Sequence, residues 1–104
     1  METSTLGKSG LTVSALGFGG APLGDLYEFI PESRASDTVV AAARAGITLF
    51  DTSPLYGHGL SEHRIGAALR RVPEHEVILS TKVGRVTDPT TPPQSRATFV
   101  GGLP

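Results

Sequence analysis

Three features are missing from this sequence, and each absence excludes a class of protein. Cysteine is absent from the 104 residues, which rules out disulfide bonds and thiolate chemistry and fits a reducing compartment. The sequence has no excess of positive charge, because the formal net charge is −1. Nucleic acid and anionic membranes are therefore not expected as partners. No apolar run approaches the roughly 18 residues of a membrane span, and polar residues 2–5 stand where a signal peptide would be basic and apolar. We expect a water-soluble, cytoplasmic protein.

Glycine and proline are abundant instead, with 13 and 8 residues. They separate short apolar runs, as frequent turns between strands and helices require. Residues 3–6 and 11–13 are predicted to be short strands joined by a hairpin turn at 7–10. Residues 15–18 are predicted to form a short buried strand that runs into a glycine-rich loop.

Two segments carry apolar residues at helical spacing. The first helix is predicted over 33–45, with Ser33 or Ser36 as its N-cap and Gly46 at its end. The second helix is predicted over 61–71. Charged residues in and beside these helices are expected on solvated faces; they are Glu32, Arg34, Arg44, Arg64, Arg70 and Arg71.

Two further strands alternate with these helices. Residues 47–51 and 77–82 are nearly continuous apolar runs, which are typical of strands covered on both faces. Strands that alternate with helices predict an α/β fold built from parallel βαβ units. Residues 87–95 have no usable period and are expected to form a loop.

Polar side chains stand at the ends of both strands. Asp51 ends the first and Lys82 the second, and Tyr56 follows Asp51 in a loop. Parallel strands finish at one edge of a sheet, where βα folds place their active sites, so the three side chains are expected to meet. An ammonium group beside a phenol stabilises the phenolate, which makes the phenol a general acid for a carbonyl that accepts a hydride. In this hypothesis Asp51 holds Lys82 in place and keeps it charged.

Structural roles are also open for these residue types. A strand-end aspartate is often a helix N-cap or turn former, a strand-end lysine is often solvated, and a loop tyrosine often serves packing. His58 and His63 beside Glu62 do not predict a metal site, because histidines five residues apart do not share a helix face and no further ligand joins them. We expect no metal.

Five ordered segments resemble the aldo-keto reductase family. Residues 50–57 (Phe-Asp-Thr-Ser-Pro-Leu-Tyr-Gly) resemble the motif that runs from the family's second barrel strand into its loop. Residues 80–84 are similar to the third-strand lysine motif, and 6–14 to the hairpin that plugs the barrel bottom. Residues 16–22 resemble the first strand with its loop, and 59–69 the helix after the motif. The details look most like the bacterial branch with D-threo-aldose (L-fucose) and pyridoxal dehydrogenases.

The resemblance implies a role for each residue that matches a motif. Tyr56 would be the proton donor, Lys82 would tune it, and Asp51 would pair with Lys82 and lie at the cofactor. Gly20 and Ala21 would line the nicotinamide side of the site. The implied cofactor is NADP or NAD, and the implied partner is a small carbonyl or alcohol substrate. The sequence indicates no oligomeric state.

The match is partial. The family uses a histidine at the end of its fourth strand and binds the cofactor phosphates mainly with late barrel loops; this sequence shows neither. A closed (β/α)8 barrel takes about 250 residues, so three strands predict the N-terminal part of a TIM barrel, incomplete and with open edges. The whole chain, 1–104, is then one partial barrel, divided into a bottom hairpin at 3–14, three strands with two helices at 15–85, and a loop or tail at 86–104.

Two functions follow from this picture. The first is a fragment of an NAD(P)-dependent oxidoreductase that interconverts an aldose or small aldehyde or ketone with its alcohol. The second is a truncated, non-catalytic remnant without independent activity. Binding of a reduced nicotinamide cofactor by the chain separates them.

Overall fold

The computed structural model describes residues 1–84, so the predicted loop at 87–95 and the predicted tail at 86–104 lie outside it. Helices and strands follow the predicted order, with one additional 3-10 helix after the first parallel strand. Within the described residues, no helix has the length and apolar character needed to cross a bilayer. The elements are β1 (Thr3–Thr5), β2 (Thr12–Ser14), β3 (Gly17–Gly19), η1 (Ala21–Gly24), α1 (Glu32–Arg44), β4 (Leu49–Asp51), α2 (Leu60–Leu69) and β5 (Ile78–Ser80).

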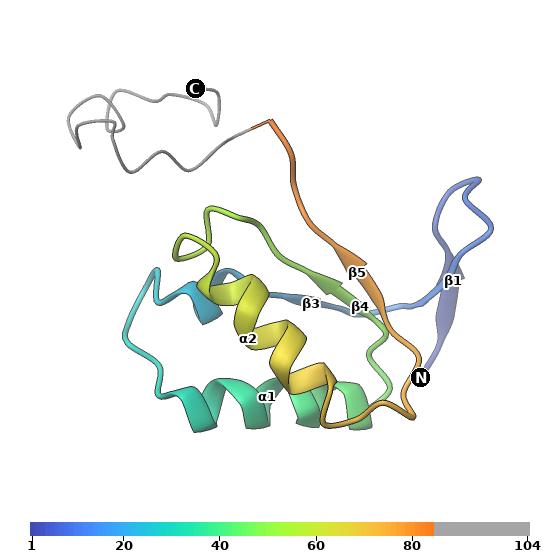
Figure 1. The fold of residues 1–104 in the computed structure, drawn as a ribbon. Coiled ribbons are helices and arrows are strands. Elements are labelled where there is room, and N and C mark those ends of the chain that lie inside the picture. Colours follow the sequence, from blue (N-terminus) through green and yellow to red (C-terminus); the bar gives the residue numbers. More distant parts are fainter. Residues whose placement is uncertain (85–104) are drawn as a thin grey trace.

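The parallel sheet has β4 at its centre, between β3 and β5. Phe50 of β4 stands opposite Phe18 on one side and Leu79 on the other, and Asp51 stands opposite Gly19. Figure 1 shows the three strands running in the same direction, away from the β1–β2 hairpin and toward η1. The predicted parallel βαβ arrangement is confirmed, and the sheet is open rather than closed into a barrel.

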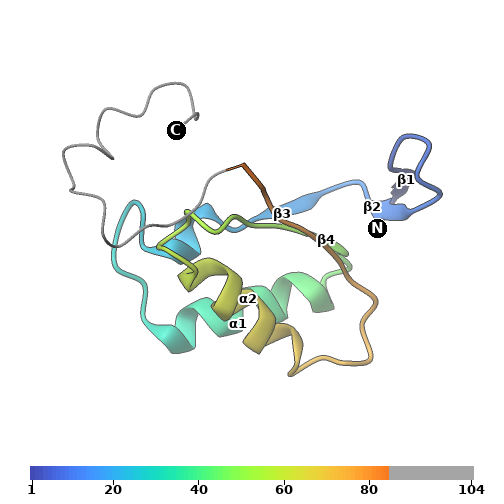
Figure 2. The ribbon, with the colours of Figure 1, turned by 45° about the horizontal axis from the view of Figure 1, so that its top comes forward.

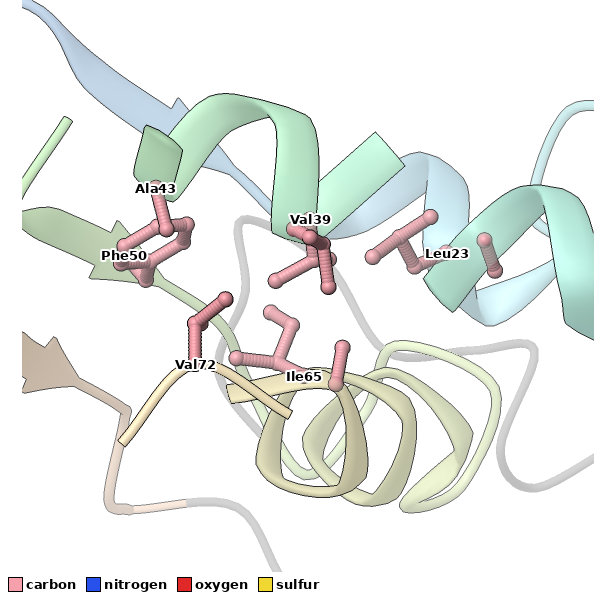
Figure 3. Packing of buried hydrophobic residues seen from close by; sticks show 9 residues of the cluster. Leu23, Val39, Ala43, Phe50, Ile65 and Val72 are labelled. Atoms are coloured by element: carbon pink, nitrogen blue, oxygen red, sulfur yellow. The ribbon is translucent and has the colours of Figure 1, made fainter. Parts of the chain in front are cut away.

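Both α-helices pack on the same face of this sheet (Figures 1 and 2). Between helices and sheet lies the apolar core, in which Phe50 is completely buried. Figure 3 shows Val39 of α1 and Ile65 of α2 pointing toward each other within it. Phe18 stacks beside Phe50 with ring centroids 5.5 Å apart. Each such buried side chain stabilises the fold by about 1.5–3 kcal/mol, which holds β4 firmly on the helices.

The prediction that both better strands are covered on two faces is wrong, because within residues 1–84 both α-helices lie on one face of the sheet. The exposure is greater in β5 than in β4. Leu79 is 57% exposed although it stands opposite the buried Phe50. The physical reason is position in the sheet: β5 is an edge strand, and no described helix packs over Leu79. An apolar run alone does not distinguish a central strand from an edge strand.

The predicted serine cap of α1 is also wrong. The helix begins at Glu32 with Pro31 as its N-cap, and no side chain caps it. The Pro31 carbonyl accepts the first helical hydrogen bond from the Ala35 amide at 3.0 Å, so Ser33 already lies inside the first turn. The predicted end at Gly46 is confirmed, since the helix ends at Arg44 and Gly46 follows with φ +104°.

The hairpin is tied to the sheet at the end opposite to η1. Ser14 and Thr48 form two reciprocal hydrogen bonds between backbone and side chain. The Ser14 amide donates to Thr48 Oγ1 at 2.8 Å, and the Thr48 amide donates to Ser14 Oγ at 2.9 Å. This pair joins the end of β2 to the residue before β4. At the opposite end, where the strands finish, the side chains of Asp51 and Lys82 are partly exposed among residues 1–84.

Candidate active site

Asp51, Tyr56 and Lys82 converge at the carboxyl edge of the sheet. Asp51 is the last residue of β4, and Lys82 lies two residues past β5. The Lys82 ammonium donates a hydrogen bond to Asp51 Oδ2 at 3.0 Å. The same nitrogen lies 5.0 Å from the centroid of the Tyr56 ring. The structure therefore brings together the three side chains singled out by the sequence, and their role in chemistry stays a prediction.

A backbone carbonyl completes the setting of Lys82. Thr52 O accepts a second hydrogen bond from the Lys82 ammonium at 3.0 Å. Thr52 is itself attached to β5, because its amide donates to Ser80 O at 2.8 Å. The ammonium is thus fixed by two residues of one strand end rather than by the aspartate alone.

The Asp51 carboxylate raises the pKa of the Lys82 ammonium above its ordinary value of 10.5. The neighbouring Tyr56 hydroxyl adds to this rise, and slight burial opposes it. The pair is about half exposed, with 48% of the Lys82 side chain and 43% of the Asp51 side chain in contact with solvent. Lys82 consequently carries its positive charge throughout the physiological pH range.

We expect the Asp51–Lys82 pair to give a pH-dependent contribution to stability. The pKa of Lys82 is higher in the folded chain than in the unfolded chain, so the contribution is fully present below about pH 10.5 and disappears as pH rises through the folded pKa. Because the pair is half exposed, its size is under about 1 kcal/mol. Urea unfolding of wild type and Asp51→Asn at pH values between about 9 and 12 measures it; parallel curves for the two proteins would contradict it.

The Tyr56 loop is positioned by close backbone packing against η1. A Cβ placed on Gly24 would lie 2.5 Å from Tyr56 O, and one placed on Gly57 would lie 2.5 Å from Gly24 O. Gly57 also has φ +73°, which side chains rarely adopt. Both positions therefore require glycine, and the end of η1 packs directly against the backbone of the Tyr56 loop. The sequence predicts only loops in these two segments, and it gives no sign of the contact between them.

Two buried hydroxyl groups behind the site were not identified from the sequence. Ser61 Oγ lies 2.8 Å from Thr52 Oγ1 and donates to Gly20 O at 2.7 Å. The Gly20 amide in turn donates to Asp51 O at 2.8 Å. No local pattern reveals this network, because it joins the ends of β3 and β4 to the first turn of α2.

Arg64 was expected on a solvated face of its helix, and this prediction is wrong. Its side chain is 6% exposed. Its guanidinium donates to Leu23 O at 3.0 Å and Ile30 O at 2.8 Å, and pairs with Asp25 at 3.1 Å and Glu32 at 2.8 Å. A buried charge is stable only when it is paired in this way, and these partners come from η1, the loop that follows it and the first residue of α1. The other arginines predicted to be solvated are exposed; they are Arg34, Arg44, Arg70 and Arg71.

The two glycines at the end of β3 differ in the space around them. A Cβ placed on Gly19 would meet no atom within 4 Å, and Gly19 stands opposite Asp51 in the sheet. Gly20 differs, since a Cβ there would lie 2.8 Å from Asp51 O, Ser61 Oγ and Ile65 Cδ1. Gly20 is thus required for internal packing, while Ala21 is half-buried at the start of η1. Contact of Gly20 and Ala21 with a nicotinamide ring stays a prediction.

Within residues 1–84, no group of three or more His, Cys, Asp and Glu side chains is arranged to hold a metal ion. His58 and His63 are exposed, as expected for loop and helix surface.

A family model described as the aldo/keto reductase family matches residues 15–99. This chain belongs to the aldo/keto reductase family. The resemblance noted in the sequence is thereby confirmed. Aldo-keto reductases are TIM barrels, so the open sheet with its two helices is the N-terminal part of such a barrel and is incomplete.

Curated relatives in the family share almost half of the aligned residues. The chain is 45% identical over 102 residues to pyridoxal 4-dehydrogenase from Microbacterium luteolum, covering 90% of this chain and 30% of that protein. It is 47% identical over 87 residues to L-galactose dehydrogenase from Arabidopsis thaliana, covering 82% and 27%. It is 44% identical over 81 residues to D-threo-aldose 1-dehydrogenase from a Pseudomonas species, covering 78% and 25%. The chain spans less than a third of the length of these relatives.

A solved structure agrees with this placement. The holo form of the aldo-keto reductase AKR11C1 from Bacillus halodurans superposes with a TM-score of 0.74 at 35% sequence identity, covering 88% of this chain and 28% of that protein.

Proposed function

We propose that this chain carries the proton-donating part of the active site of an NAD(P)-dependent oxidoreductase that interconverts a carbonyl compound and its alcohol. The observation that carries the proposal is the position of the Lys82 ammonium, hydrogen-bonded to Asp51 and 5.0 Å from the Tyr56 ring centroid. Membership of the aldo/keto reductase family supports it.

The three side chains divide the proton chemistry among them. In the reduction direction the Tyr56 hydroxyl gives its proton to the carbonyl oxygen of the substrate, and in the oxidation direction the Tyr56 phenolate accepts the alcohol proton. The fixed positive charge of Lys82 stabilises the phenolate left behind. Asp51 holds Lys82 near the ring and keeps it charged. The nicotinamide group, when bound, supplies or accepts the hydride.

The cofactor's nicotinamide end is assigned to the edge of the sheet beside Asp51. The open space over Gly19 supports a flat ring there, and Gly20, Ala21 and Asp51 are the residues proposed to line it. The cofactor is NADP or NAD. Groups for its phosphates are not proposed among residues 1–84.

The proposed substrate is an aldose or a small aldehyde or ketone. The names of the relatives support this class, because they refer to pyridoxal, L-galactose and D-threo-aldose. The proposed location is the cytoplasm, in line with the absence of cysteine.

A chimera tests the proposed function. Residues 1–84 of this chain replace the matching segment of the Microbacterium luteolum pyridoxal 4-dehydrogenase, which supplies the rest of the barrel. We expect the chimera to reduce aldehydes or oxidise aldoses with NAD(P)(H), as followed by nicotinamide absorbance. A folded chimera that binds cofactor but turns over none of these compounds would overturn the proposal.

The non-catalytic alternative concerns the 104-residue chain by itself. The open three-stranded sheet and the short span against the relatives favour it. Titration of the chain with NADPH, followed by nicotinamide fluorescence, distinguishes the two: saturable binding supports the enzyme fragment, and a flat signal supports the remnant.

A further inference from the structure

Ser61 occupies an unusual place behind the candidate site. It lies in the first turn of α2 and is completely buried, yet it is not the N-cap of that helix, which is Gly59. Its amide donates to Tyr56 O at 3.1 Å, and its hydroxyl donates to Gly20 O at 2.7 Å. One residue therefore contacts the backbone of the tyrosine loop and the end of β3.

The direction of the next hydrogen bond follows from proton counting. A serine hydroxyl has a single proton, and that of Ser61 goes to Gly20 O, which can only accept. Thr52 Oγ1 must therefore donate to Ser61 Oγ across the 2.8 Å between them. Ser61 fixes Thr52 from behind, while Thr52 O accepts the Lys82 ammonium in front at 3.0 Å.

The same residue also reaches the aspartate. Gly20, which Ser61 holds through its carbonyl, donates its amide to Asp51 O at 2.8 Å. The backbones of Asp51 and Tyr56, and the carbonyl that binds the Lys82 ammonium, are thus each one or two hydrogen bonds away from Ser61. The two hydrogen bonds of the Ser61 hydroxyl, to Thr52 Oγ1 and Gly20 O, are buried, so water does not compete for them.

We propose that Ser61, acting with Thr52, is a positioning residue that sets the height and direction of the Lys82 ammonium relative to Tyr56. Its consequence for turnover rests on the proposed function, while its effect on Lys82 does not. A serine needed only for packing would be replaced by alanine without effect on Lys82. A serine that positions the strand end would not.

The chain offers an internal reference for the test, because Lys8 and Lys82 are its only two lysines. Brief labelling of the 104-residue chain with acetic anhydride, followed by peptide mass spectrometry, gives the ratio of Lys82 to Lys8 acetylation. Lys8 lies exposed in the hairpin turn, whereas Lys82 has its ammonium engaged by Asp51 and Thr52. We expect Lys82 to react several-fold more slowly than Lys8 in wild type, and within about twofold of it in Ser61→Ala.

Two substitutions of Thr52 give a graded test, because one removes the hydroxyl at nearly constant volume and the other keeps it. Thr52→Val removes the donor to Ser61 and is expected to raise the ratio part of the way, whereas Thr52→Ser keeps the donor and is expected to match wild type. Thr38→Val, which removes an exposed hydroxyl on α1, is the control and is expected to match wild type. A Ser61→Ala ratio equal to that of wild type, or a wild-type ratio near one, would overturn the proposal.

General unfolding is separated from a local effect by hydrogen exchange. Val39 and Val40 lie buried on α1, and their amides report on the core. The proposal is supported if Ser61→Ala raises the ratio of Lys82 to Lys8 acetylation while these two amides stay as protected from exchange as in wild type. It is overturned if the ratio rises only together with a loss of that protection. In the chimera, Ser61→Ala is expected to lower kcat about 10–100-fold with little change in cofactor binding. Should the chimera be inactive while the labelling result holds, the proposed function fails and the positioning role of Ser61 stands.

Discussion

Replacement of Tyr56 by Phe in the chimera is expected to lower kcat by about 10²–10⁴-fold, the usual contribution of a positioned general acid. The ring would keep its place against η1, because the contacts of this loop with Gly24 are made by backbone atoms. The hydroxyl proton, however, would be gone. Steady-state rates of carbonyl reduction, together with an NADPH titration, measure the two effects separately.

The matched control for this substitution is Tyr27→Phe. Tyr27 is the only other tyrosine in the chain and is 76% exposed, so loss of its hydroxyl is expected to leave kcat within about twofold of the parent. Binding of NADPH is expected to be unchanged in both variants, since neither hydroxyl is assigned to the cofactor. A Tyr56→Phe chimera that retains most of its turnover would remove Tyr56 as the proton donor and leave Lys82 without a group to tune.

The meeting of Asp51 and Lys82 was predictable because it depends on a global rule. Strands joined by right-handed crossovers run parallel and finish at one edge, so residues that end consecutive strands become neighbours without any knowledge of packing. The order of helices and strands was equally predictable from the spacing of apolar residues and from the glycine and proline residues that separate the apolar runs. Local sequence patterns and the rule for parallel strands are thus enough to predict the order of the elements and the meeting of these two side chains.

The hydrogen bonds behind the site could not be predicted from such rules. Ser61 and Thr52 are nine residues apart and on different elements, and small hydroxyl residues occur in loops and first helical turns for many reasons. The predicted cap of α1 failed for a related reason. Serine favours N-caps in general, but here Arg64 holds Ile30 O and the Glu32 carboxylate, and these long-range bonds fix the start of the helix.

Arg64 shows why a charged residue in a helix is misplaced by sequence reasoning. Charged side chains are almost never fully buried unless paired, so a solvated face is the default expectation. Its partners lie 32 to 41 residues earlier in the chain, and no pattern near Arg64 announces them. The default was correct for Arg71, which is half exposed and bonds Ser36 and Asp37 at the surface.

This contrast leads to the second large effect that we expect. Arg64→Ala should lower the free energy of unfolding by about 2–4 kcal/mol. Leu23 O and Ile30 O lose their donors, and the segment between β3 and α1 loses its attachment to α2. This loss is expected to be smaller than for a fully buried ion pair, because the Glu32 side chain is 66% exposed and stays solvated without Arg64. Urea unfolding followed by far-UV circular dichroism measures the change.

Arg71→Ala is the matched control, with an expected loss under about 1 kcal/mol for a surface pair. Arg64→Lys keeps the charge but lacks the planar fork that reaches several acceptors at once, so its stability should lie between wild type and Arg64→Ala. Because η1 rests on the tyrosine loop through Gly24, the Arg64 variants in the chimera should also lose turnover in the same order. Equal losses of stability for Arg64→Ala and Arg71→Ala would mean that burial of the Arg64 guanidinium contributes nothing, and the role assigned to η1 in holding Tyr56 would fall with it.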